Sequence, residues 1–173
     1  MISLTHTARL WSLFAILALI LPTTGFAADL TSPEGVLRIL VQANVDKDFA
    51  TISRLMAHDD DAVSYTIEGR KYVGWNDFAR DMQSEFDSVT RLDIPITQLK
   101  VWTRGETAWF VMELDYIRYI GSGKEEVKMV LPLRETGIME RRNGQWILVT
   151  FHESFRSEAA IMPSNNQAFP SLQ

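Results

Sequence analysis

The chain has 173 residues, a formal net charge of −5 and no cysteine. Its acidic balance and its lack of clustered Lys and Arg argue against a nucleic-acid partner, and without cysteine it cannot be stabilised by disulfides. The length suits one domain with a single core.

The N-terminal segment has the features of a secretory signal. An apolar run from Leu10 to Leu21 follows Arg9 and is shorter than the ~20 residues that a membrane-spanning helix needs. Small residues at Gly25 and Ala27 suit a cleavage site. The pattern therefore predicts a periplasmic or secreted protein without membrane attachment after cleavage, with an uncleaved anchor as the alternative.

The sequence has three predicted parts, and cleavage after Ala27 separates the first from the other two. Residues 1–27 are the predicted signal peptide, and residues 28–157 are the predicted domain. The remainder, residues 158–173, contains Pro, Ser, Asn and Gln without sustained periodicity. We expect this tail to be loosely ordered.

Three helices are predicted in the first half of the mature chain. Ser32 is a suitable N-cap with Pro33 at the first helical position, and apolar residues recur at helical spacing as far as Val45. Asp48 can cap a second, short helix, and Asn76 a third. Between the second and third helices, alternation interrupted by glycine predicts two short strands.

The second half is predicted to be sheet. Four long segments alternate apolar and polar residues, at 91–102, 107–120, 125–142 and 145–155. Asn143 and Gly144 are typical of a two-residue type I′ turn, which needs positive φ at both positions. This turn predicts an antiparallel hairpin between the last two strands.

The hairpin register sorts side chains onto two faces of the sheet. Counting outward from the Asn143–Gly144 turn pairs Glu135 with His152, and closing the preceding turn in the simplest way pairs Phe110 with Glu135. Both Glu135 and His152 are then expected to point toward the helices. A β-bulge would shift this register locally.

The order of these elements resembles the nuclear transport factor 2 superfamily. The closing block, residues 134–154, looks like its SnoaL-like branch and also like the association domain of calcium/calmodulin-dependent kinase II, with "DYIRY", "ETG", "RRNGQW" and "TFH" matching in order. The resemblance implies an α+β, cone-shaped fold in which three helices pack on a curved antiparallel sheet around a pocket. It does not imply one function, because the superfamily includes isomerases, cyclases, hydrolases, binding modules and assembly domains.

Only some of the functional residues of these related families have a counterpart in this sequence. Arg118 and His152 match pocket-side positions of the association domain, whereas its pocket Arg falls at Gly137 and its first closing His at Thr150. The ketosteroid isomerase base falls near Thr66, and the first helix has no Tyr. A steroid-isomerase mechanism is therefore poorly supported.

His152 and Glu135 are the candidate catalytic pair, since a carboxylate that orients an imidazole makes a good general base. A structural hydrogen-bonded pair is the simpler interpretation. The candidate ligand-binding residues are the aromatic and basic side chains expected at the pocket: Tyr65, Tyr72, Trp75, Phe110, Tyr116 and Arg118. For the aromatic residues core packing is the alternative, and for Arg118 a solvated side chain.

No cofactor or metal is expected. The sequence has no phosphate-binding loop and no Cys–His signature. The acidic turn "HDDD" at residues 58–61 lacks the Gly and the distal Glu of a calcium loop.

The face of the sheet directed away from the helices is predicted to be too apolar to remain exposed to water. Its large side chains include Trp109, Val111, Ile138, Val149 and Phe151. A homodimer through this outer face is the expected cover, and packing of the C-terminal tail against it is the alternative.

Three functions are compatible with these patterns. The first is an exported binding protein whose pocket takes a small, mostly apolar ligand. The second is a pocket enzyme of the isomerase, cyclase or hydrolase type, with His152 as general base. The third is a homo-oligomeric assembly domain.

Overall fold

The computed structural model describes residues 29–156. The predicted signal peptide, residues 1–27, and the predicted tail, residues 158–173, lie outside the described residues, as does the expected packing of the tail. Within the described part, no helix has both the length and the apolar character that crossing a membrane requires.

Three helices form where the capping residues predict them: α1 (Pro33–Val45), α2 (Phe49–Leu55) and α3 (Asn76–Ser88). The Ser32 side chain accepts a hydrogen bond from the Gly35 amide, and Asp48 caps α2 through the Thr51 amide. The third helix differs by one residue from the prediction. Trp75 is its N-cap and makes no side-chain capping bond, so Asn76 is the first helical residue.

The strands are β1 (Val63–Tyr65), β2 (Lys71–Val73), β3 (Arg91–Asp93), β4 (Ile96–Arg104), β5 (Thr107–Ile120), β6 (Val127–Arg142) and β7 (Gln145–Phe155). A 3-10 turn, η1 (Gly123–Glu125), connects β5 to β6. The first predicted long strand is therefore two strands. They separate next to Pro95, which has no N–H to donate to a ladder.

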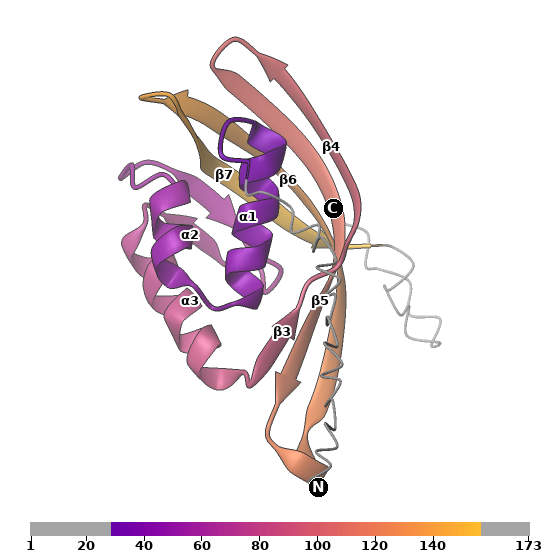
Figure 1. The fold of residues 1–173 in the computed structure, drawn as a ribbon. Helices are drawn as coiled ribbons and strands as arrows, with labels where there is room; N and C mark the ends of the chain where they lie inside the picture. The colour runs from indigo at the N-terminus through magenta and orange to yellow at the C-terminus, as the bar shows by residue number, and fades with distance from the viewer. Residues whose placement is uncertain (1–28, 157–173) are drawn as a thin grey trace, which may run out of the picture.

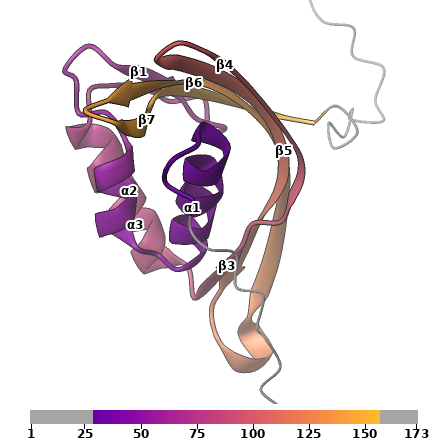
Figure 2. The ribbon, with the colours of Figure 1, turned by 45° about the horizontal axis from the view of Figure 1, so that its top comes forward.

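The sheet has the order β2-β1-β7-β6-β5-β3, and β4 also pairs with β5. Figure 1 shows all three helices on the same side of this sheet, and Figure 2 shows the sheet curving around α1. The pairing is antiparallel except between β1 and β7, where Tyr65 aligns with His152 in parallel. The fold is thus the predicted cone-like α+β arrangement, with a mixed sheet instead of a wholly antiparallel one.

The core lies between the helices and the concave face of the sheet. Its largest fully buried side chains come from both layers: Leu37, Ile52, Leu55, Leu92, Phe110 and Met139. The hairpin of β5 and β6 extends past α3 and β3 (Figure 1), which leaves Val127 and Met129 exposed although alternation places them on the inner face.

The register between β5 and β6 differs from the prediction by two residues. Phe110 pairs with Gly137 and Met112 with Glu135, because the connection between the strands runs from Gly121 to Glu126 and is longer than a simple turn. A strand alternates with a period of two, so this displacement leaves every side chain on its predicted face. Glu135 accordingly points toward the helices, as expected.

The register between β6 and β7 contains a bulge that the prediction omits. Asn143 and Gly144 have φ of 52° and 83°, and the hairpin begins with the predicted pair of Arg142 and Gln145. Between Ile138 and Met139 the pairing then skips one residue of β7, Val149. Beyond the bulge the two faces of β7 are exchanged.

The exchange corrects two predictions. Thr136 pairs with His152 and Glu135 pairs with Glu153, so the expected pair of Glu135 and His152 is wrong. His152 is exposed on the outer side, and Phe151 is buried on the inner side. Val149 and Phe151 therefore do not both belong to an apolar outer face.

Gly137 makes the close packing at the bulge feasible. A Cβ on this residue would lie 2.5 Å from the Thr150 carbonyl oxygen and 2.6 Å from Phe110 Cε1. Either approach is far shorter than a van der Waals contact, so the site excludes any larger side chain. On the outer face nearby, Trp109, Val111 and Ile138 remain exposed by 40%, 44% and 43%.

Candidate functional site

A cavity of about 470 Å³ lies between the helices and the concave face of the sheet. Apolar side chains from both layers form most of its wall, among them Leu37, Leu40, Phe86, Met112, Leu133 and Phe151. The volume lies within the ~300–1,000 Å³ range typical of small-molecule sites. A mostly apolar wall with a few polar groups is also the usual composition of such sites.

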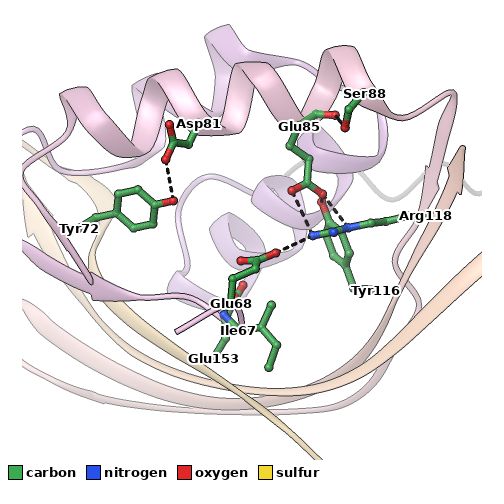
Figure 3. Close-up of polar contacts among 9 residues, drawn as sticks. All are labelled: Ile67, Glu68, Tyr72, Asp81, Glu85, Ser88, Tyr116, Arg118 and Glu153. Carbon is green, nitrogen blue, oxygen red and sulfur yellow. Dashed lines mark hydrogen bonds and ion pairs between the residues drawn. The ribbon is translucent and has the colours of Figure 1, made fainter. Parts of the chain in front are cut away.

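One side of the cavity is a hydrogen-bonded network between α3 and the sheet (Figure 3). Arg118 Nε lies 2.8 Å from Glu85 Oε1 and its Nη2 lies 3.1 Å from Glu68 Oε1. The Nε contact is an ion pair without hydrogen-bond alignment, whereas Nη2 donates to both carboxylates. Tyr116 donates its hydroxyl proton to Glu85 at 3.1 Å.

A second contact joins β2 to α3. The Tyr72 hydroxyl donates to Asp81 Oδ2 at 3.0 Å, and Arg70 forms an ion pair with the same carboxylate. Burial and this hydrogen bond raise the pKa of Tyr72, and burial raises the pKa of Tyr116 as well. Both phenols are therefore protonated donors at neutral pH, and they position the acidic side chains of α3.

Glu135 and Glu153 form a facing carboxyl pair on β6 and β7, and both border the cavity. Burial and the charge of Glu153 raise the pKa of Glu135 to about 8. Burial also raises the pKa of Glu153 to about 7, although a hydrogen bond from the Ile67 amide, 2.9 Å long, favours its ionised form. Two adjacent carboxylates repel each other, so the pair retains a proton near neutral pH.

The structure brings four of the predicted site residues to the cavity: Tyr72, Tyr116, Arg118 and Glu135. Alternation along β5 and β6 predicts the inner face for Tyr116, Arg118 and Glu135, whereas Tyr72 is expected at the pocket from the position of the short strands. Arg118 is bound by two carboxylates and is not a solvated side chain.

The other four predicted site residues do not border the cavity. Phe110 is a core residue with 1% exposure, and Trp75 stacks on His58 with ring centroids 4.4 Å apart. Tyr65 is 44% exposed and packs edge-on against the exposed His152. No observation assigns these residues a catalytic or ligand-binding role.

Sequence reasoning missed most of the acidic residues of the cavity: Glu68, Asp81, Glu85 and Glu153. The predicted register puts Glu153 on the outer face because it omits the bulge. A signal was present, since the apolar residues Trp146, Leu148 and Phe151 change from a spacing of two to a spacing of three. Gly137 on the partner strand is a second signal, because a lone glycine in a strand marks a bulge or a close approach.

The profile of the SnoaL-like domain matches residues 35–158. The chain belongs to the SnoaL-like domain family. The match spans α1 to β7, so the cavity described above lies wholly within this SnoaL-like domain. A search among curated proteins finds no match.

Solved structures confirm the SnoaL-like fold. A proposed dehydratase of the nuclear-transport-factor-2-like family from Streptomyces avermitilis is 17% identical, with a TM-score of 0.63, and the alignment covers 70% of this chain and 92% of that one. A protein of the same superfamily from Salmonella enterica serovar Typhimurium has a TM-score of 0.63 at 11% identity, covering 75% and 92%.

A third similar structure carries a different description. It is a proposed calcium/calmodulin-dependent kinase II association domain from Thiobacillus denitrificans, 16% identical, with a TM-score of 0.59 and coverage of 73% and 97%. The three solved structures share this fold but are described as having different functions or none. The function of this SnoaL-like domain therefore has to be argued from its own cavity.

Proposed function

We propose that this protein binds a small, mostly apolar molecule in the cavity between its helices and its sheet, and that it does so after export from the cytoplasm. The cavity carries the proposal, because its volume of about 470 Å³ and its largely apolar wall suit a small organic molecule. The N-terminal pattern of Arg9, an apolar run and small residues supports export.

The polar groups of the cavity suit a binding site because they are held in place. Arg118 is fixed by two carboxylates, and the tyrosine hydroxyls are fixed by acidic residues of α3. Groups that are already ordered lose little further freedom when a ligand binds. Ligand binding therefore costs less conformational entropy at this wall than at an exposed surface.

Two measurements test the binding function. Native mass spectrometry of the protein purified from its own host should show a small-molecule mass excess that denaturation removes. Fluorescence titration with N-phenyl-1-naphthylamine, a neutral apolar probe, should show saturable binding to the protein stripped of that molecule.

A matched pair of variants locates the probe. Met82 borders the cavity from α3, so Met82→Trp should fill part of it and weaken probe binding by about tenfold or more. Met129 is exposed near the tip of the β5–β6 hairpin, so Met129→Trp makes the same substitution away from the cavity and should leave binding unchanged. Equal effects of the two variants, or no saturable binding at all, would contradict the proposal.

General acid–base catalysis is the second candidate, and the Glu135–Glu153 pair favours it. A carboxyl pair that retains a proton near neutral pH offers a donor and an acceptor in one apolar site. Turnover of the co-purifying molecule, abolished by Glu135→Gln while binding persists, would support an enzyme of the isomerase, cyclase or hydrolase type.

A further inference from the structure

The acidic pair in the cavity has no basic partner. Glu135 and Glu153 are register partners on neighbouring strands, which brings their Cβ atoms to within about 4.5–5.5 Å. Within residues 29–156 neither carboxyl forms a salt bridge, and the polar contact found for the pair is the Ile67 amide on Glu153. One neutral backbone donor cannot compensate the charge of two partly buried carboxyl groups.

The two arginines that border the cavity are already engaged. Arg118 is held between Glu85 and Glu68, and Arg70 is paired with Asp81. Three acidic side chains therefore occupy the two guanidinium groups of the described cavity wall, and neither guanidinium is left to pair with a further carboxylate. The remaining two acidic residues of the wall, Glu135 and Glu153, leave the cavity with an excess of negative charge.

A further polar group, the Thr66 hydroxyl, lies at the same end of the cavity as Glu153. The hydroxyl oxygen of Thr66 is buried, has no hydrogen-bond partner and borders the cavity. Thr66 directly precedes Ile67, whose amide contacts Glu153, so the hydroxyl belongs to the same end of the cavity. A buried hydroxyl without a protein partner is uncommon, so this one is available to a ligand group that reaches it.

We propose that the ligand is a small amine with an apolar body, and that its ammonium group binds between Glu135 and Glu153 with Thr66 as a third acceptor. This inference rests on the proposed binding function and specifies its ligand class. An ammonium carries three N–H donors, which match the two carboxyl groups and the hydroxyl. The apolar body would then pack against side chains such as Phe151 and Met112.

An ammonium group fits this site better than an anionic group or a multivalent metal ion does. A carboxylate or phosphate ligand would add negative charge to a cavity whose guanidinium groups are already paired. A metal ion requires more ligands than this pair supplies, and among the described residues no cluster of three His, Cys, Asp or Glu side chains could hold one. An ammonium supplies one positive charge and keeps the rest of the ligand apolar.

Binding of the cation should also release protons. The empty pair retains a proton near neutral pH because burial and mutual repulsion disfavour two negative charges. An ammonium between the carboxyls favours the ionised form of both, so the retained proton leaves when the amine binds. Glu68, Glu85 and Arg118 also face Glu153, and since they keep their own contacts the change is concentrated on the pair.

Isothermal titration with two isosteric probes tests the inference. At about pH 8, 2-phenylethylamine is a cation, like the amine of lysine, and 2-phenylethanol is its neutral counterpart. We expect the amine to bind about 10- to 100-fold more tightly, the range that a hydrogen bond to a charged group provides. The preference should disappear at about pH 5, where the pair is protonated.

Variants and buffers provide the controls. The double variant Glu135→Gln/Glu153→Gln should lose the preference for the amine and keep its affinity for the alcohol, whereas Glu126→Gln, at an exposed position, should retain both. Titrations of the wild type near neutral pH, in two buffers with different ionisation enthalpies, should show release of up to about one proton per amine bound.

The outcomes separate the two proposals. If 2-phenylethanol and N-phenyl-1-naphthylamine bind but the amine binds no more tightly, the amine inference is wrong and the binding function stands. If the preference persists in the double variant, the ammonium binds elsewhere and the inference is also wrong. If none of the three compounds binds, the proposed function fails together with the inference.

Discussion

Replacement of Glu135 by glutamine should stabilise the protein, and only at neutral and alkaline pH. The pKa of Glu135 is raised from 4.5 to about 8 by burial and by the charge of Glu153. Below pH 4.5 the carboxyl is protonated in both the folded and the unfolded chain, so it has no pH-linked effect on stability. As the pH rises from 4.5 to about 8, the unfolded chain ionises first, and the folded state loses stability.

The magnitude follows from the same values. Each pH unit between the unfolded-state and folded-state pKa corresponds to about 1.4 kcal/mol, so the rise to about 8 sets an upper bound of about 5 kcal/mol. Water in the cavity and relaxation of the side chain reduce this cost. We therefore expect Glu135→Gln to be more stable than the wild type by about 2–4 kcal/mol at pH 9 and nearly equal to it near pH 4.5.

Urea denaturation followed by tryptophan fluorescence measures this difference at a series of pH values from about 4.5 to about 9. Glu126→Gln is the control, since it removes a carboxyl from an exposed position and should show no pH-dependent gain. Glu68, Glu85 and Arg118, which act on the charge of Glu153, are present in the wild type and in both variants. A stability difference that does not change with pH, or one that grows toward acid, would refute the argument.

Three further predictions concern Gly137, His152 and the outer face. Gly137→Ala should destabilise the fold by at least about 1–3 kcal/mol, because the new Cβ has no room against the neighbouring carbonyl and aromatic ring; thermal unfolding measures this, and an unchanged midpoint would contradict the bulge geometry. His152→Ala should leave probe binding within about twofold of wild type, since the imidazole is exposed outside the cavity; a large loss in the same titration would restore His152 as a site residue. The homodimer through the outer face remains a prediction: sedimentation should show a dimer that Val111→Lys/Ile138→Lys converts to a folded monomer, and a monomeric wild type would exclude it.

The helices and the strands on which the cavity is built were predictable because their signals are local. Ser32 with Pro33 and Asp48 satisfy the first amides of their helices in the way that the capping rule requires. Asn143 and Gly144 adopt the positive φ that their turn needs. Each of these signals depends on a few consecutive residues, and no tertiary contact overrides it.

The composition of the cavity was less predictable because it depends on contacts between distant segments. Glu85 on α3, Glu68 after β1 and Arg118 on β5 meet only when the helix packs across the curved sheet (Figure 3). Glu68 and Glu85 have the sequence context of ordinary surface residues. Their role as partners of Arg118 becomes visible only once the sheet order and the position of α3 are known.

The register errors show why a bulge matters more here than a misplaced turn. The β5–β6 connection displaces the pairing by two residues, which changes every partner but no face, so Glu135 reaches the cavity as predicted. The bulge at Val149 displaces β7 by a single residue, which exchanges its faces. His152 thereby leaves the cavity and Glu153 enters it. That one residue replaces the predicted imidazole–carboxylate pair with two facing carboxyl groups. The candidate general base is lost from the cavity, and the proposed ammonium site stands in its place.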